Sequence, residues 1–285
     1  MRVVFFGTPE FAIPTLEAVA REHEIALVVA QPDRPAGRGM KMHEPPLVSR
    51  ARQLGLDVAQ PPKIRDPEFL RRVEAIAPDA AVVIAYGKIL PKHLLDIPRE
   101  GFFNVHASVL PEYRGAAPVQ RAIEAGETTT GVTIMRVDEE LDHGPILAIE
   151  PAQIGPDERA PSLFARLSKL GGDLLVRTLR ELSPGTPQDH SRATLAPKIE
   201  KHEGLITFSE PPQTIYNKFR AFDPWPGVCF DVNGESIKII DLLPADRNAP
   251  AHGTLVVNGL RLITLQRPGK PKAPAEDVAR GIGWP

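Results

Sequence analysis

Short runs of aliphatic residues alternate with segments of helical spacing over about the first 150 residues. After the first run, for example, Phe11, Leu16 and Val19 recur at intervals that place them on one side of a helix. Uninterrupted Val- and Ile-rich runs are typical of strands buried on both faces, and hence of a mostly parallel sheet. The runs occupy residues 2–6, 25–30, 80–84, 102–105 and 132–137. We therefore predict an α/β fold with a Rossmann-like, doubly wound sheet.

A long helix and a polar segment follow this region. Seven leucines between positions 163 and 182 lie on one face of a helix that we predict over residues 162–182. The run Ser183-Pro-Gly-Thr-Pro187 ends this helix, because proline cannot continue it and glycine favours a turn. Residues 188–205 begin with a polar stretch and are predicted to link two domains, the first of which spans residues 1–187.

The last 80 residues show a different pattern, in which polar and apolar residues alternate around Asn-Gly pairs. Asn233-Gly234 and Asn258-Gly259 each separate two alternating segments. Asn-Gly between such segments is a strong hairpin signal, since both central residues of the turn adopt positive φ. Two hairpins predict a smaller antiparallel β-barrel domain over residues 206–285, for which an OB-like barrel is the candidate.

The composition is that of an ordinary two-domain globular protein. The 285 residues are about twice a typical domain, and 42% of them are hydrophobic, which allows a sizeable core. The 31 prolines are roughly double the average share and exclude a coiled coil. Cys229 is the only cysteine, which excludes an internal disulfide framework. The longest apolar run, 80–86, is far shorter than the ~18 residues of a membrane span, so we expect a soluble, cytoplasmic protein that binds no membrane.

Four common catalytic motifs are absent from the sequence. The first predicted strand runs into Gly7-Thr-Pro-Glu-Phe11 rather than the Gly-x-Gly-x-x-Gly that binds a dinucleotide. The chain also lacks a phosphate-binding Gly-x-x-x-x-Gly-Lys-Ser/Thr, a His-Glu-x-x-His and a Gly-x-Ser-x-Gly. These absences argue against NAD, ATP, zinc and serine-hydrolase chemistry, and we expect no metal.

Asn104 and His106 close the predicted strand that begins at Phe102. Residues i and i+2 of a strand share a face, so the amide and the imidazole project together. At the carboxyl end of a parallel strand the pair would lie where such sheets bind ligands. An amide N–H and an imidazolium can both stabilise the oxyanion that forms when an amine attacks a carbonyl. The alternative is a polar pair that caps the strand end, with His106 a satisfied, semi-buried histidine.

Asp142 lies in the acidic segment 137–144, which follows another predicted strand. Four acidic residues among eight are usual for a solvated turn, and that interpretation stays open. A carboxylate brought against His106 would favour the charged imidazole and could accept a proton from an attacking ammonium.

Several separated motifs resemble one family. They are Asn104-Val-His106-Ala-Ser108-Val-Leu-Pro111, Arg114-Gly-Ala-Ala-Pro118-Val-Gln120, Gly131-Val-Thr-Ile-Met135, Leu141-Asp142-His-Gly144, Gln31-Pro-Asp-Arg34-Pro-Ala-Gly-Arg38-Gly39, Ala221-Phe-Asp-Pro-Trp225-Pro226 and Leu265-Gln-Arg-Pro-Gly-Lys270. Together they resemble the formyltransferases that use 10-formyltetrahydrofolate. The last three motifs resemble the members of that family that formylate methionyl initiator tRNA. The match runs essentially from end to end of the chain.

The resemblance implies a set of functional residues. The family's catalytic trio falls on Asn104, His106 and Asp142. Its folate contacts fall on Ser108, Val109, Leu110 and Pro111, and Tyr86 and Gly87 flank the same pocket. The tRNA contacts implied for the basic loop are Arg34, Arg38 and Lys41. The implied co-substrate is 10-formyltetrahydrofolate, the implied acceptor is initiator methionyl-tRNA, and we expect a monomer.

The sequence departs from the family at two of these places. Val109 stands where leucine is usual, a loss of one methylene that leaves folate binding possible. Met40 replaces the lysine that usually follows the Arg-Gly of the basic loop, which makes Lys41 the substitute. The loop lies in segment 31–65, where basic residues exceed acidic ones by four although the formal net charge of the chain is −2. Such a loop can follow phosphates without reading sequence, and we expect it to be mobile and to order on contact.

Three other functions remain open from the sequence. The same trio could formylate a sugar-nucleotide or another small amine, although the basic loop and the C-terminal motifs argue against this acceptor. A non-enzymatic RNA-binding module is opposed by the intact trio. A Rossmann oxidoreductase is opposed by the missing glycine motif.

Overall fold

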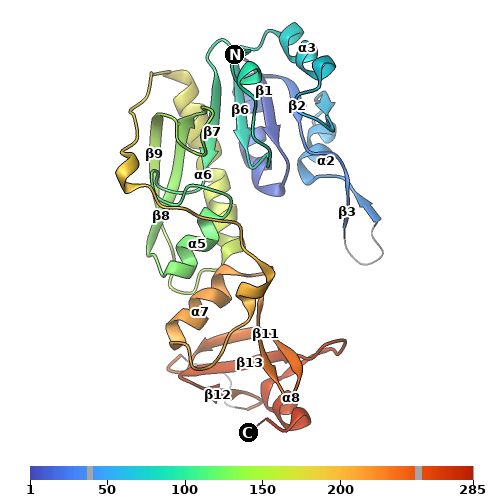
Figure 1. Cartoon of the computed structure of the whole chain (residues 1–285), viewed down its shortest axis with the longest axis vertical. Coiled ribbons are helices and arrows are strands. Elements are labelled where there is room, and N and C mark those ends of the chain that lie inside the picture. Colours follow the sequence, from blue (N-terminus) through green and yellow to red (C-terminus); the bar gives the residue numbers. More distant parts are fainter. Residues whose placement is uncertain (37–40, 248–251, 285) are drawn as a thin grey trace. The chain divides into compact units, whose positions relative to one another are not determined.

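The computed structural model of the chain describes residues 1–36, 41–247 and 252–284 (Figure 1). Contacts between residues divide it into two compact units. Unit 1 contains residues 1–118, 129–153 and 164–196, and unit 2 contains residues 119–128, 154–163 and 197–285. The expected linker 188–205 is therefore split at residue 196. Residues 188–196 belong to unit 1 because they pair with its backbone, as in the bridge between Arg114 and Leu195.

A seven-stranded sheet forms the centre of unit 1. Its order is β5-β2-β1-β6-β7-β8-β9. The strands are β1 (Arg2–Gly7), β2 (Glu24–Val29), β5 (Val58–Ala59), β6 (Ala80–Ile84), β7 (Phe102–His106), β8 (Thr129–Arg136) and β9 (Ile146–Gln153). The first four pairings in this order, from β5 to β7, are parallel, whereas β8 runs antiparallel to both β7 and β9. The mostly parallel, Rossmann-like sheet is thus confirmed, with two antiparallel strands at one edge.

Helices cover both faces of this sheet. On one face Val4 and Phe6 of β1 share a buried core with Phe69 and Val73 of helix α3 (Pro67–Ile76) and Leu94 of α4 (Lys92–Leu95). On the other face the long helix α6 (Ala160–Arg180) covers β7 and β8, close to the predicted range 162–182. A Cβ on Gly171 of α6 would lie 2.6 Å from Val105 Cγ1, so the helix can approach the sheet only because this residue is glycine.

The remaining elements of unit 1 frame the sheet. Helices α1 (Ile13–Glu22) and α2 (Pro46–Gln53) follow the first strands, whereas α5 (Pro118–Ala125), which precedes β8, belongs to unit 2 from residue 119 on. Short strands β3 (Arg34–Ala36) and β4 (Lys41–His43) pair antiparallel, with Arg34 opposite His43 and Ala36 opposite Lys41. The loop is expected to be mobile. The residues that flank it on either side nevertheless pair through their backbones and form a two-stranded sheet.

Unit 2 is built on an antiparallel sheet of five strands. They are β10 (Val228–Val232), β11 (Glu235–Pro244), β12 (Leu255–Val257), β13 (Leu260–Gln266) and β14 (Lys272–Pro274), accompanied by α7 (Pro212–Ala221) and α8 (Ala275–Ile282). Both Asn-Gly pairs form the predicted hairpin turns, with φ of 50° and 79° at 233–234 and of 47° and 68° at 258–259. The antiparallel domain is confirmed, and its closure into an OB-like barrel stays a prediction.

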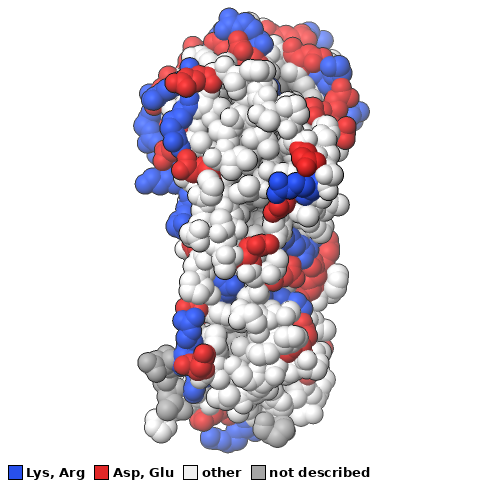
Figure 2. Space-filling view, turned by 90° about the vertical axis from the view of Figure 1, so that its left-hand side faces the viewer, with Lys and Arg blue, Asp and Glu red and all other residues white. Residues whose placement is uncertain are grey.

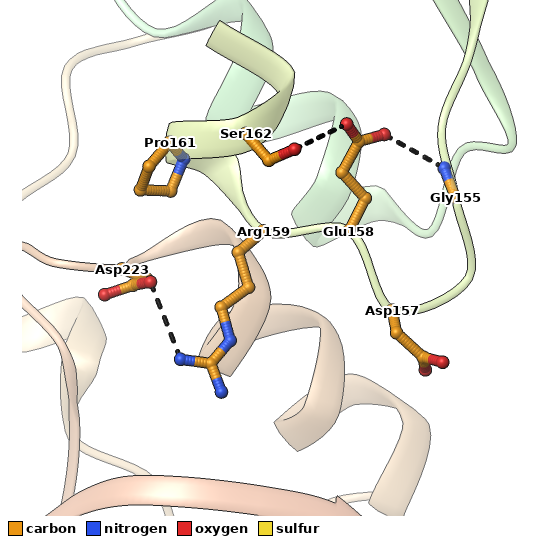
Figure 3. A pocket seen from close by; sticks show the side chains of 7 residues that line it. All are labelled: Gly155, Asp157, Glu158, Arg159, Pro161, Ser162 and Asp223. Atoms are coloured by element: carbon orange, nitrogen blue, oxygen red, sulfur yellow. Dashed lines mark hydrogen bonds and ion pairs between the residues drawn. The ribbon is translucent and has the colours of Figure 1, made fainter. Parts of the chain in front are cut away.

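Unit 2 also holds a pocket of about 550 Å³ (Figure 3). Its cationic lining residue, Arg159, lies 3.6 Å from the Asp223 carboxylate and 3.0 Å from that of Asp241. The same guanidinium packs 4.4 Å from the centre of the Phe219 ring. The charge of Arg159 is therefore neutralised by the carboxylates of the unit itself.

Candidate active site

The topology of the sheet points to the carboxyl ends of its central parallel strands as the ligand-binding edge of unit 1. Counted along the chain, the parallel strands lie in the order third, second, first, fourth and fifth, so the order reverses between β1 and β6. Ligands of doubly wound sheets bind outside the carboxyl ends of the strands at this reversal. Tyr86 and Gly87 follow the end of β6, and His106 ends the neighbouring strand β7.

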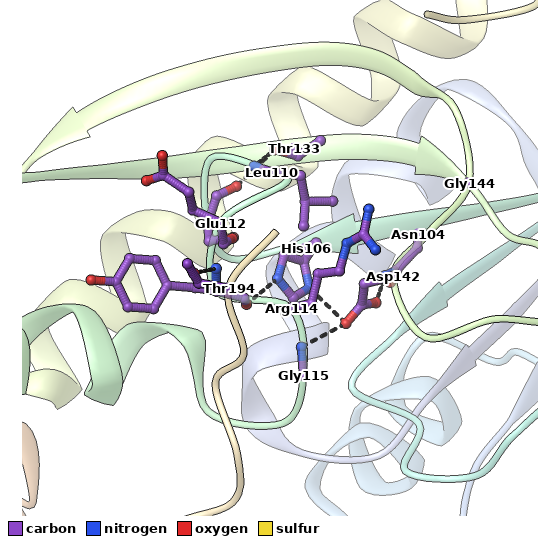
Figure 4. A network of polar contacts seen from close by, with 12 residues as sticks. Asn104, His106, Leu110, Glu112, Arg114, Gly115, Thr133, Asp142, Gly144 and Thr194 are labelled. Atoms are coloured by element: carbon purple, nitrogen blue, oxygen red, sulfur yellow. Dashed lines mark hydrogen bonds and ion pairs between the residues drawn. The ribbon is translucent and has the colours of Figure 1, made fainter. Parts of the chain in front are cut away.

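Asn104, His106 and Asp142 converge at this edge (Figure 4). The Asn104 Nδ2 donates a hydrogen bond to Asp142 Oδ1 at 3.2 Å, and His106 Nδ1 lies 3.6 Å from Asp142 Oδ2. The backbone N–H of Gly115 also donates to Asp142 Oδ2, at 2.8 Å. Strand alternation predicts that Asn104 and His106 project together, and both side chains do lie against the Asp142 carboxylate, 36 or more residues further along the chain.

The His106 imidazole is held by acceptors on both of its nitrogens. Its Nε2 donates to the carbonyl of Tyr113 at 3.0 Å, while Nδ1 faces the Asp142 carboxylate. The imidazole side chain is 6% exposed and the Asp142 side chain 13% exposed, so little water screens their interaction. A protonated His106 can therefore direct a positive charge into this site.

Asp142 reaches the site on a turn that doubles back along β7. Because β8 is antiparallel to β7, it ends with Arg136 opposite Phe103, at the far end of β7 from His106. The chain must then return toward His106, and Asp142 takes a left-handed φ of 47° within this turn. A Cβ on Gly144 would lie 2.0 Å from the Arg136 carbonyl oxygen, so the turn requires glycine at that position.

Two residues that sequence reasoning missed hold this turn. Gln188 is 6% exposed, and its Nε2 donates to the carbonyls of Asp142 at 3.0 Å and Gly144 at 2.8 Å. Arg114 is 8% exposed and donates from Nη2 to Gln188 Oε1 at 2.6 Å. Gln188 lies in the polar segment predicted as linker, and only its burial in the fold distinguishes it from a solvated residue.

The predicted folate segment 108–111 follows β7 directly. Ser108 and Leu110 are buried, and Thr133 of β8 fixes their backbone: its Oγ1 donates to the Ser108 carbonyl at 2.7 Å and accepts from the Leu110 N–H at 3.1 Å. The Leu110–Pro111 peptide is cis, and Val109 is half-buried. Folate binding by these four residues stays a prediction, but they lie at the end of the strand that carries Asn104 and His106.

Tyr86 and Gly87 form a turn after β6. Gly87 is exposed with a φ of 81°, whereas the Tyr86 ring is buried edge-on against Phe6. The Tyr86 hydroxyl has no hydrogen-bond partner among the described residues, and burial raises the pKa of Tyr86 to about 12. The Tyr86 carbonyl accepts from Gln31 Nε2 at 3.1 Å, which ties this turn to the base of the β3–β4 hairpin.

Two of the three predicted tRNA contacts lie among the residues that the structure describes. Arg34 and Lys41 lie on the exposed β3–β4 hairpin, and Arg38 lies outside the described residues. The Arg34 guanidinium donates to Gln31 Oε1 at 3.1 Å. Figure 2 shows the molecule from another side, where Lys and Arg lie around the margins with Asp and Glu among them and mostly uncharged residues fill the middle. That face offers no continuous basic surface to an RNA backbone.

Two further observations bear on the expected partners. Among residues 1–36, 41–247 and 252–284, no three His, Cys, Asp or Glu side chains are grouped so that they could hold a metal ion. Over the same residues, no helix combines the length and the apolar character that crossing a bilayer demands.

Comparison with known proteins places the chain in a family. The family model "Formyl transferase" matches residues 1–179, and the model "Formyl transferase, C-terminal domain" matches residues 198–283. The chain therefore belongs to the formyl transferase family. It is 45% identical to the methionyl-tRNA formyltransferase of Acidobacterium capsulatum over 300 aligned positions, which cover 99% of this chain and 96% of the relative.

Solved structures of the same fold include proteins with different names and bound molecules. A methionyl-tRNA formyltransferase from Clostridium thermocellum superposes with a TM-score of 0.64 at 16% identity, covering 94% of this chain and 98% of its own. An N-formyltransferase from Helicobacter canadensis, in complex with folinic acid and dTDP-3-aminofucose, gives a TM-score of 0.67 at 18% identity, covering 93% and 98%. These likenesses establish the fold, and the fold alone does not select the acceptor.

Proposed function

We propose that this protein transfers the formyl group of 10-formyltetrahydrofolate to the α-amine of methionyl initiator tRNA. The observation that carries the proposal is the convergence of Asn104, His106 and Asp142 at the carboxyl edge of the sheet. The acceptor is supported by the 45% identity to a methionyl-tRNA formyltransferase along 99% of the chain. We also propose that the protein acts as a monomer in the cytoplasm.

Each of the three side chains has its own role in the transfer. The amine attacks the formyl carbon, a C–N bond forms, and negative charge develops on the formyl oxygen. The Asn104 amide and a protonated His106 are placed to stabilise that charge. Asp142 orients the histidine and takes up the proton that the attacking amine loses. As the bond from the formyl carbon to N10 breaks, N10 gains a proton and tetrahydrofolate leaves.

The residues beside the trio fit a folate co-substrate. Leu110 is apolar and held in place by Thr133, so the segment is rigid before a ligand arrives. After the neighbouring strand β6, the buried Tyr86 hydroxyl has no hydrogen-bond partner among the described residues, and the backbone of Gly87 is exposed. Segments 108–111 and 86–87 would hold the co-substrate, whose role is to supply the formyl group.

The acceptor is tested by direct competition. Purified protein is given labelled 10-formyltetrahydrofolate with either charged initiator tRNA or an amino-sugar nucleotide, and transfer of label is followed. We expect transfer to the methionyl-tRNA alone. Transfer to the sugar nucleotide would replace the proposed acceptor, whereas no transfer to either, with folate binding retained, would contradict a formyltransferase function.

A further inference from the structure

Gln188 clamps both ends of the turn that carries Asp142. Its two amide hydrogens are donated to two carbonyls of that turn, to Asp142 O at 3.0 Å and to Gly144 O at 2.8 Å. The residue is 6% exposed, so water does not compete for these bonds. A carboxamide that spans two carbonyls fixes their separation and hence the position of the residues between them.

Arg114 sets the orientation of the Gln188 carboxamide. Arginine is a donor only, so its contact of 2.6 Å must be to the Gln188 oxygen, which turns the NH₂ group toward the Asp142 turn. The same Nη2 donates to His190 Nδ1 at 2.8 Å, and the His190 ring stacks on His143 at 4.0 Å. His143 follows Asp142 in the chain, so the turn is held from its backbone by Gln188 and from its side by the stacked ring.

Gln188 holds the turn that carries the Asp142 carboxylate, the group that the proposed reaction needs. The Asp142 carboxylate must lie beside His106, yet its backbone adopts a φ of 47°, which L-residues rarely populate. Relaxing that conformation would rotate the carboxylate away from Asn104 and His106. We propose that Gln188 is a positioning residue for formyl transfer: held by Arg114, it keeps the Asp142 carboxylate in its reactive place. The inference rests on the proposed function of the site.

The isosteric variant Gln188→Glu tests the clamp. It keeps an oxygen for Arg114 but replaces both donated hydrogens with lone pairs that repel the two carbonyls. We expect kcat for formyl transfer to fall by about 10- to 100-fold, since misplacing a catalytic group by about 1 Å can cost 10²-fold. KM for both substrates should stay within about twofold, because the Gln188 carboxamide is fully engaged by Arg114 and the two carbonyls of the turn. A larger KM with unchanged kcat would overturn the positioning role.

Coupling to Asp142 separates positioning from general damage. In an Asp142→Asn background the additional change Gln188→Glu should lower kcat by less than about threefold, because there is no longer a carboxylate to place. Equal losses in both backgrounds would contradict the proposal. The control is Gln53→Glu on α2, whose carboxamide also accepts from an arginine, Arg50, at 3.1 Å but is exposed and distant in the fold from the turn. That variant should retain wild-type kcat.

Amide hydrogen exchange gives a readout that needs no activity. Peptides that cover residues 138–145 should exchange faster in Gln188→Glu than in the wild type, and those of Gln53→Glu should not. Unchanged exchange would overturn the clamp, and so would a variant that fails to fold, since it would show a requirement for folding instead. A wild-type protein without transfer activity would defeat the proposed function, while the exchange result would still decide whether Gln188 holds the turn.

Discussion

His106 Nδ1 lies 3.6 Å from Asp142 Oδ2, and each of the two groups is fixed by other partners. Tyr113 holds the far nitrogen of the imidazole, while Gly115 and Asn104 occupy the two carboxylate oxygens. The distance between the two atoms exceeds that of a hydrogen bond. Catalytic hydrogen bonds are often long before substrate binds, and a shift of less than 1 Å would close this one.

We expect Asp142→Asn to lower kcat by about 10²- to 10⁴-fold, the range for a group that acts in proton transfer. The new amide can accept from Gly115 through one atom only, and its NH₂ then opposes the Asn104 NH₂. Steady-state formylation of methionyl-tRNA measures the effect. A variant that changes only KM would show that Asp142 binds substrate rather than acting in the chemical step.

Asn104→Ala should reduce kcat by about 10²- to 10³-fold if the amide stabilises charge on the formyl oxygen. Asn104 also donates to Asp142, so part of the loss can come through that carboxylate. Combining Asn104→Ala with Asp142→Asn separates the two contributions. Fully additive losses would assign the amide a role of its own, and a double variant no worse than Asp142→Asn would remove it from charge stabilisation.

The basic loop is tested by salt titration of tRNA binding. Arg38→Ala and Lys41→Ala should each flatten the dependence of log affinity on log salt by about one unit, because each removes one phosphate contact. Arg72→Ala on α3, where the arginine pairs with Asp57, is the control and should leave the slope unchanged. Wild-type slopes in both the Arg38→Ala and the Lys41→Ala variant would mean that tRNA is bound elsewhere.

Stability at high pH depends on Tyr86. Burial raises its pKa to about 12, above the ordinary value of 10.0, so the folded state keeps a proton that the unfolded chain loses. This contribution is complete below pH 10 and is lost as the pH rises through 10 to 12. Tyr86→Phe also removes a hydroxyl that has no partner among the described residues.

We therefore expect Tyr86→Phe to unfold at a higher urea concentration than the wild type in alkaline buffer, and to be at least as stable at pH 7. Equilibrium unfolding at both pH values measures this. The variant also tests folate binding: a raised KM for 10-formyltetrahydrofolate would show that the hydroxyl contacts the co-substrate. Equal alkaline losses in variant and wild type would exclude Tyr86 as the group responsible.

Gly144→Ala should destabilise the protein by about 1–3 kcal/mol, the usual cost of forcing extra atoms into a packed site. The added methyl would meet the Arg136 carbonyl at 2.0 Å, and a backbone group cannot move aside as a side chain can. Urea unfolding and kcat are both measured, since the same turn carries Asp142. Gly281→Ala on α8, where the added methyl would lie 3.9 Å from the Arg267 guanidinium, is the control and should be neutral or stabilising.

Local patterns predict the parts of this site that lie on one strand. Asn104 and His106 share a face because strand side chains alternate, and the Asn-Gly turns form because both residues tolerate positive φ. The direction of β8 could not be predicted, since a buried apolar strand looks the same in either direction.

Gln188 could not be predicted for a different reason. It follows a proline-rich turn in a polar stretch, a pattern typical of exposed connections, and its partner Asp142 lies 46 residues away. The pairing of Thr186 with Ile146, at the edge of the sheet, and the bridge between Arg114 and Leu195 bring the segment back against unit 1. Contacts of this range depend on the assembled fold, so composition gives no sign of them.

The return of segment 186–196 to unit 1 decides where this enzyme can be cut. A fragment ending at residue 179, where the first family model stops, would lack Gln188 and the backbone strip that pairs with Arg114. Such a fragment would retain Asn104, His106 and Asp142 yet leave the aspartate turn untethered. Anyone who grafts the transferase half onto a new acceptor-binding module should therefore place the junction after Ala196, the last residue of unit 1.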